Sequence, residues 1–161
     1  MKKVLYLHGL ESNQGGPKVD FLAKEFCVHA PSMDYTNPMV QNELEFIMRQ
    51  FNPDLIIGSS MGGYAADILA EKYGKPAIMF NPALHNRTFE PALNYPIAGE
   101  EADLQDRKVV VLGKNDDIIP PYLTKIMLEN NFNYKIVLEE MGHQVPLPIF
   151  IDIVNKYKNE L

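Results

Sequence analysis

A chain of 161 residues with 46% hydrophobic and 22% charged residues has the composition of one globular domain, which excludes a disordered chain or a coiled coil. Its net charge of −6 opposes binding to phosphate backbones and anionic lipid surfaces, so we expect no nucleic acid and no membrane partner. The single cysteine, Cys27, permits no intramolecular disulfide, and we expect it to be a buried, inert thiol. The N-terminal apolar run is far shorter than the core of a signal peptide, so we expect a cytoplasmic location.

Short aliphatic runs alternate along the chain with longer stretches of helical period, and this alternation is typical of βαβ units. We predict strands at residues 4–7, 27–30, 54–57, 77–80, 109–112 and 134–138. We predict helices at about residues 17–26, 37–51, 61–73, 121–130 and 148–157, the second with Asn37 and Pro38 as cap and first turn. The fold class is therefore α/β, a single domain over residues 1–161 with about six mainly parallel strands and helices on both faces.

Residues 81–107, between the fourth and fifth predicted strands, follow no single period. This segment contains three prolines, the aromatic residues Phe89 and Tyr95, and an acidic end. Segments of this length in compact domains are commonly lids or binding loops, so we expect a lid-like insertion whose Phe89 and Tyr95 contact substrate. A solvated insertion without a function is the alternative.

The third predicted strand leads into Gly58-Ser59-Ser60-Met61-Gly62, a Gly-x-Ser-x-Gly motif followed directly by a helix. A strand, a sharp turn and a helix in this order expose the hydroxyl of the central serine, and the glycines permit close strand–helix approach. Ser60 is therefore a candidate nucleophile. A glycine-rich turn without chemistry is the alternative interpretation of the motif taken alone.

A serine nucleophile needs a base and an acid that orients the base, and in parallel sheets such groups gather at the carboxyl ends of strands. Asp116 and Asp117 follow the fifth predicted strand, and His143 follows the sixth. We expect Gly142 to allow close approach of the imidazole. The chain order serine, acid, histidine is that of the α/β-hydrolase triad.

Attack by a serine on an acyl group forms a tetrahedral intermediate with a negatively charged oxygen, and this oxyanion needs backbone N–H groups as hydrogen-bond donors. We assign one to the Met61 N–H, immediately after the serine, and the second to the Leu10 N–H in the loop after the first strand. His8, in that loop, either shapes the turn through hydrogen bonds or contacts substrate. We expect His85 to be an exposed residue of the insertion rather than a base.

Five short motifs resemble the small YqiA/YcfP-type esterases of the α/β-hydrolase superfamily: residues 6–10 (Tyr-Leu-His-Gly-Leu), 58–63 (Gly-Ser-Ser-Met-Gly-Gly), 81–83 (Asn-Pro-Ala), 113–116 (Gly-Lys-Asn-Asp) and 142–143 (Gly-His). The resemblance covers nearly the whole chain. It implies a reduced hydrolase sheet without the two leading antiparallel strands of the superfamily, and an esterase or thioesterase activity on small acyl substrates. It places Ser60, Asp116 and His143 in the triad, and the spacing from Asp116 to Pro120 favours this acid over Asp117.

We therefore predict a serine hydrolase whose partner is a small acyl ester or thioester. The four histidines are dispersed and no metal-binding pair is present, so we expect no metal and no cofactor. The same triad could serve a peptidase, a C–C hydrolase or an acyltransferase. A catalytically silent hydrolase fold that acts as a protein-interaction module is the alternative from a different class.

Overall fold

The computed structural model describes residues 1–10, 15–97 and 107–161. Its strands are β1 (Lys3–Leu7), β2 (Cys27–His29), β3 (Leu55–Ser59), β4 (Ala77–Phe80), β5 (Lys108–Gly113) and β6 (Tyr134–Glu139). Its helices are α1 (Pro17–Glu25), α2 (Val40–Phe51), α3 (Met61–Tyr73), α4 (Pro121–Leu128) and α5 (Leu147–Tyr157). The six strands form one sheet in the order β2-β1-β3-β4-β5-β6, and every pair is parallel. The predicted α/β fold class is confirmed.

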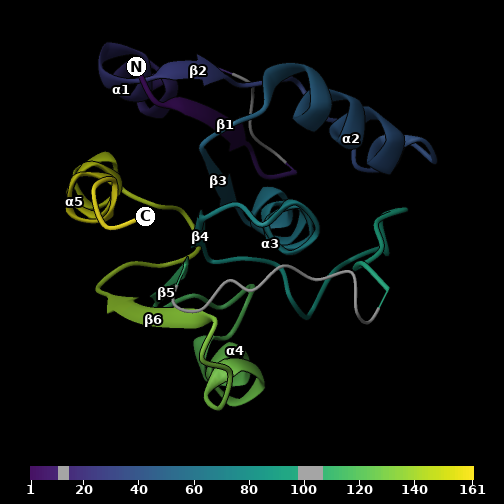
Figure 1. Ribbon diagram of the computed structural model, residues 1–161. Coiled ribbons are helices and arrows are strands. Elements are labelled where there is room, and N and C mark those ends of the chain that lie inside the picture. Colours follow the sequence, from purple (N-terminus) through teal and green to yellow (C-terminus); the bar gives the residue numbers. More distant parts are fainter. Residues whose placement is uncertain (11–14, 98–106) are drawn as a thin grey trace.

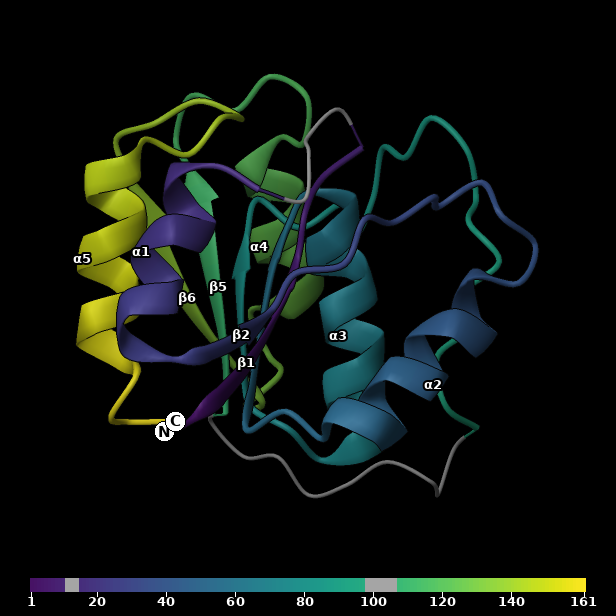
Figure 2. The same ribbon diagram turned by 90° about the horizontal axis from the view of Figure 1, so that it is seen from above.

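The helices cover the sheet in two layers (Figures 1 and 2). Helices α1 and α5 lie on one face and α2, α3 and α4 on the other. Each layer closes its own apolar cluster against the sheet, one containing Leu22 and Phe150 and the other Leu44 and Leu128. A parallel sheet covered on both faces explains why the central strands are continuous apolar runs rather than alternating ones.

Strand β3 lies at the centre of this arrangement. Its register pairs Ile56 with Leu5 of β1 on one side and with Ala77 of β4 on the other. The chain runs from β1 to β2 at the sheet edge and then returns to β3 on the opposite side of β1. Connections that diverge in this way leave a crevice at the carboxyl ends of the strands, and in this fold class ligands bind there. Ser60 follows β3 at this edge.

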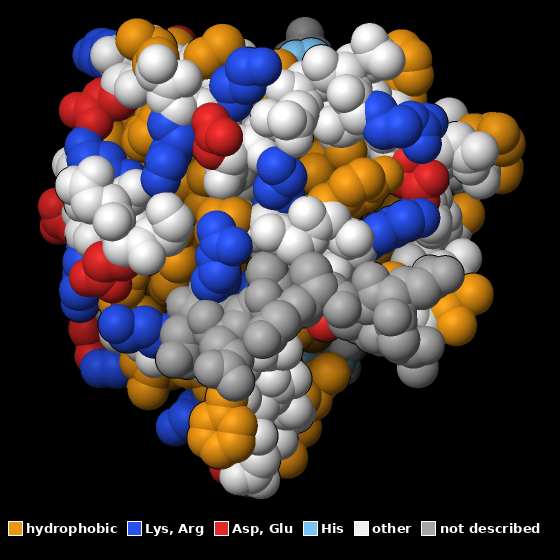
Figure 3. All heavy atoms as spheres, in the orientation of Figure 1, with side chains coloured by type: hydrophobic (Ala, Val, Ile, Leu, Met, Phe, Trp, Pro, Cys, Tyr) orange, Lys and Arg blue, Asp and Glu red, His pale blue; other side chains and the backbone are white. Residues whose placement is uncertain are grey.

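The opposite, amino edge of the sheet carries both chain ends (Figure 2). The Lys2 ammonium joins them by donating to the Lys158 and Leu161 carbonyls at 2.9 Å each. Acidic and basic side chains are interspersed over the described part of this face (Figure 3). Among the described residues, no helix is long and apolar enough to cross a membrane.

Two predictions about local structure need correction. Cys27 is exposed rather than buried, because β2 is an edge strand whose first and last residues face solvent. Helix α2 begins at Val40, because the Asn37 carboxamide accepts the Met39 N–H in a turn that precedes the helix instead of capping it. Of the predicted insertion, residues 81–97 contain no helix or strand, and residues 98–106 lie outside the described part of the chain.

Candidate active site

The sequence motif around Ser60 forms the expected sharp turn between β3 and α3. Ser60 has φ 54° and ψ −117°, a conformation that non-glycine residues rarely adopt and that costs about 1–3 kcal/mol. The turn is held by the Ser60 N–H, which donates to the Phe80 carbonyl at 3.0 Å. The Ser60 carbonyl accepts the N–H groups of Tyr64 and Ala83 at 3.1 and 2.9 Å. Local strain of this kind is typical of a functional position rather than of an ordinary helix start.

The glycines of the motif permit this turn for a packing reason. A Cβ atom on Gly62 would overlap the carbonyl groups of Leu7 and His8 at the end of β1, and one on Gly58 would overlap the backbone of Gly62 itself. Any larger residue at either position would therefore push α3 away from the sheet. The close approach places the end of β1 directly beside the turn.

Three side chains from three different strand ends form a continuous hydrogen-bonded chain at this edge. The Ser60 Oγ lies 3.1 Å from the His143 Nε2, and the His143 Nδ1 lies 2.9 Å from the Asp116 Oδ2. The Asp116 carboxylate is buried while the imidazole remains partly accessible. This arrangement allows the imidazole to take a proton from the serine while its other nitrogen donates to the carboxylate.

The structure also decides between the two adjacent acids. Asp116 is 4% exposed, and its Oδ1 accepts the N–H groups of Ile118 and Ile119 at 2.9 Å each. Those two bonds fix the carboxylate and leave Oδ2 for His143. Asp117 is exposed. The acid that contacts the imidazole is therefore Asp116, the residue that the sequence favoured.

The glycine that permits a close approach by the loop of His143, residues 140–143, is not the one predicted. A Cβ on Gly142 would meet its nearest neighbour, the Asn115 carbonyl, at an ordinary 3.8 Å, so Gly142 makes no unusually close approach. A Cβ on Gly113, at the end of β5, would lie 2.5 Å from the carbonyl oxygens of both Met141 and Gly142. The loop of His143 crosses the end of β5, and this crossing requires a glycine on the strand rather than in the loop.

The two predicted oxyanion donors, the N–H groups of Met61 and Leu10, lie on different elements, one at the start of α3 and the other after β1. Met61 is the first residue of α3, where the N–H groups point out of the helix end and carry its positive dipole. Leu10 follows β1 and is 43% exposed. Since Gly62 packs against the end of β1, the loop that contains Leu10 leaves the sheet beside the turn. Its role as a donor stays a prediction.

His8 is 4% exposed and both of its ring nitrogens are engaged. Its Nδ1 donates to the Gly9 carbonyl at 2.6 Å, and its Nε2 accepts the Met33 N–H at 2.9 Å. The His8 carbonyl accepts the Tyr35 hydroxyl at 2.6 Å. These bonds hold the loop after β1 against residues 33–35, and they leave neither ring nitrogen for a substrate.

Phe89 and Tyr95 hold residues 81–97 against the layer of α2 and α3. Phe89 packs on the apolar cluster of that layer. The Tyr95 hydroxyl donates to the Asp67 carboxylate at 2.6 Å, and its ring lies edge-on to Tyr64 of α3, with 6.0 Å between centroids. Contact of these two side chains with an acyl group stays a prediction.

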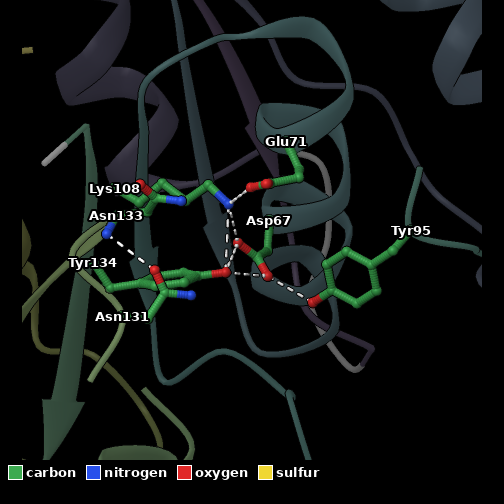
Figure 4. A network of polar contacts seen from close by, with 7 residues as sticks. All are labelled: Asp67, Glu71, Tyr95, Lys108, Asn131, Asn133 and Tyr134. Carbon is green, nitrogen blue, oxygen red and sulfur yellow. Dashed lines mark hydrogen bonds and ion pairs between the residues drawn. The ribbon is translucent and has the colours of Figure 1, made fainter. Parts of the chain in front are cut away.

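Asp67 belongs to a second polar cluster (Figure 4), which the sequence did not predict. The Lys108 ammonium, completely buried, lies 3.0 Å from the Asp67 carboxylate and also binds Glu71. The Tyr134 hydroxyl donates to Asp67 at 2.9 Å. Burial raises the pKa of the Tyr134 and Tyr95 hydroxyls, and the negative charge of Asp67 raises both further.

This cluster lies away from the serine. Lys108 and Tyr134 are the first residues of β5 and β6, at the amino edge, whereas Ser60 and His143 lie at the carboxyl edge. The cluster therefore stabilises the packing of α3, β5 and residues 81–97 on one another rather than taking part in the site.

His85 is not the exposed residue that the sequence predicted. It is half-buried, and its Nε2 lies 2.9 Å from the Thr124 hydroxyl of α4. Burial lowers the pKa of its imidazole, although the Pro120 carbonyl opposes the shift. Residues 81–97 therefore contact α4 as well as α3. Within residues 1–10, 15–97 and 107–161, no group of three or more His, Cys, Asp or Glu side chains could hold a metal ion.

Comparison with known proteins agrees with this architecture. Residues 3–101 match the model of Uncharacterised protein family UPF0227. The chain belongs to this family. The resemblance to YqiA-like proteins drawn from the sequence is thereby confirmed.

Solved structures show that the UPF0227 chain has the α/β-hydrolase fold. The monoacylglycerol lipase of Paleococcus ferrophilus superposes with a TM-score of 0.73 at 15% identity, covering 99% of this chain and 95% of that one. The carboxylesterase of Bacillus cereus gives 0.62 at 22% identity, covering 99% and 89%. A thermophilic esterase of Thermogutta terrifontis gives 0.66 at 17% identity, with the same coverage.

Proposed function

We propose that this UPF0227 protein is a serine hydrolase that cleaves a small carboxylic ester or thioester through an acyl-enzyme intermediate. The observation that carries the proposal is the hydrogen-bonded chain from Ser60 through His143 to the buried Asp116. The esterases and the lipase among its structural neighbours agree with an ester as substrate.

In the first half of the reaction, the Ser60 Oγ attacks the acyl carbonyl while its proton passes to the His143 Nε2. The Asp116 carboxylate holds the imidazole with Nε2 facing the serine and stabilises the imidazolium that forms. The N–H groups of Met61 and Leu10 stabilise the oxyanion, and a well-placed donor of this kind contributes about 3–4 kcal/mol. The bond to the leaving group then breaks, and His143 returns the proton to the alkoxide or thiolate.

In the second half, water attacks the acyl group on Ser60 and transfers a proton to the His143 Nε2. The acyl–oxygen bond to Ser60 breaks, and the proton on His143 returns to the serine oxygen. The products are a carboxylic acid and the free enzyme. The strained turn presents Ser60 Oγ to substrate without a conformational change of the backbone.

A fluorophosphonate probe tests the nucleophile directly. We expect the wild-type protein to be labelled and the Ser60→Ala variant to remain unlabelled, with Ser59→Ala as the matched control that keeps full labelling. No labelling of the wild type, or equal labelling of Ser60→Ala, would overturn the proposal and favour a silent fold that binds another protein.

A survey of p-nitrophenyl esters and acyl-CoA thioesters of graded length then defines the substrate class. We expect turnover to fall as the acyl chain lengthens, because residues 81–97 begin beside the serine turn, where the Ala83 N–H donates to the Ser60 carbonyl at 2.9 Å, and this segment would limit the room for a long acyl chain. A flat profile across the series would remove the acyl-site role assigned to this segment.

A further inference from the structure

Asn81 directly follows β4 and has a backbone conformation that few residues accept. It has φ 42°, in the left-handed region, where asparagine is among the few non-glycine residues that occur regularly. Its side chain is buried, at 1% exposed. Its N–H donates to the Val111 carbonyl at 2.8 Å, which extends the ladder between β4 and β5 by one residue.

The Asn81 carboxamide uses both its donors and its acceptor on backbone groups of the neighbouring strand ends. Its Nδ2 donates to the carbonyls of Gly142 and His143 at 3.1 and 2.9 Å. Its Oδ1 accepts the N–H of Gly113 at 2.7 Å. A buried polar side chain that makes three bonds to fixed backbone groups can adopt only one orientation.

Backbone hydrogen bonds next to Asn81 and its partners link these groups to the other two residues of the site. The last carbonyl of β4 accepts the Ser60 N–H, and the Gly113 carbonyl accepts the Asp116 N–H at 3.1 Å. Asn81 thus bonds to the backbone of His143 and lies between the segments that hold the serine and the acid. The loop of His143 has a second connection to the acid loop, from the Asn115 N–H to the Met141 carbonyl at 3.1 Å, so its fold does not depend on Asn81 alone.

We propose that Asn81 is a positioning residue, which fixes the His143 backbone so that the imidazole stays in line between Ser60 and Asp116. The proposal rests on the function proposed above. Within the described part of the chain, the Asn81 carboxamide hydrogen-bonds to backbone groups only, so it acts on the reaction through the position of His143. Displacement of a catalytic group by about 1 Å costs on the order of 100-fold in rate, and substrate binding does not share this cost.

The test compares Asn81→Gly and Asn81→Asp with Asn86→Gly. Glycine accepts the left-handed backbone but removes all three side-chain bonds, whereas aspartate keeps the shape and the acceptor to Gly113 and loses both donors. Asn86 also has positive φ (54°), lies in the same segment and is exposed, so it is the matched control. Thermal unfolding establishes that each variant is folded.

On a p-nitrophenyl ester, we expect both Asn81 variants to lower kcat by about 10- to 100-fold with KM within about twofold of wild type. Asn86→Gly should leave both constants unchanged. In the ¹H NMR spectrum, the His143 Nδ1 proton, shifted downfield by its bond to Asp116, should broaden or move in the Asn81 variants only.

Folded Asn81 variants with the kcat and the downfield resonance of Asn86→Gly would overturn the positioning role, as would a loss expressed in KM alone. Unfolding of both Asn81 variants would show a folding role instead and would also overturn it. If the wild type reacts with neither the probe nor esters, the hydrolase proposal fails. The NMR comparison then still decides whether Asn81 positions His143.

Discussion

Replacing Asp116 with asparagine tests whether this residue orients His143, because the structure shows which hydrogen bonds each oxygen of the side chain accepts. Oδ1 accepts two backbone N–H groups and Oδ2 accepts the His143 Nδ1–H. In Asp116→Asn, the amide oxygen keeps the two backbone donors and the amide NH₂ takes the place of Oδ2. The NH₂ can only donate to His143, so Nδ1 becomes an acceptor and Nε2 carries the proton.

An imidazole in that tautomer cannot take the proton of Ser60. The corresponding substitution in serine proteases lowers kcat by about 10⁴-fold, and we expect a loss of this order here. At about 1.36 kcal/mol per factor of ten, this corresponds to roughly 5.5 kcal/mol of transition-state stabilisation. Because the two backbone bonds persist, the variant should remain folded.

The assay is the steady-state kcat on a p-nitrophenyl ester, with Asp117→Asn as the matched control. The control removes the same charge from the adjacent exposed residue and should leave kcat unchanged. Retention of more than about a tenth of the activity by Asp116→Asn would refute the assignment of the acid, given the magnitude above. A comparable loss in Asp117→Asn would show that the charge of the loop matters and not the orientation of His143.

Three further predictions concern stability. Phe150→Ala should lower the free energy of unfolding by about 3–5 kcal/mol in urea titrations, because this completely buried ring packs against several aromatic rings; Phe132→Ala, 83% exposed, should change it little. Lys108→Met should lower the free energy of unfolding by about 3–5 kcal/mol, because it leaves the two carboxylates of α3 without their buried partner. Removal of the exposed ion pair between Lys114 and Glu140 should leave Tm unchanged. Burial raises the pKa of Tyr6 to about 12, so this tyrosine contributes stability that is complete below pH 10 and is lost as pH rises from 10 to 12. Tyr6→Phe should therefore reduce the alkaline loss of stability in unfolding titrations between these two pH values, and an unchanged pH dependence would contradict the shift.

The positions of the strands and of the serine turn were predictable because their causes are local. Short β-branched or aliphatic runs between helical stretches indicate strands in an α/β chain, and a strand occurs at each of the six predicted positions. The Gly-x-Ser-x-Gly spacing likewise predicts a strained turn, and Ser60 has it. Asn81 belonged to a motif recognised in the sequence, but its hydrogen bonds to the loop of His143 were missed. An asparagine directly after a buried strand indicates a turn, and nothing in the sequence shows which carbonyls its amide will meet.

The order of Ser60, Asp116 and His143 along the chain was therefore determined by the sequence alone, together with the strand ends that carry these residues. Only the tertiary structure showed the contact between Asp116 and His143, the exposure of Cys27 at the sheet edge, and the close crossing of Gly113 by the loop of His143. The physical reason is the range of the interactions. Backbone conformation and periodicity depend on neighbours in the chain, whereas burial, strand order and the partner of a side chain depend on segments far apart in the sequence, such as Ser60 and His143, which are separated by 83 positions.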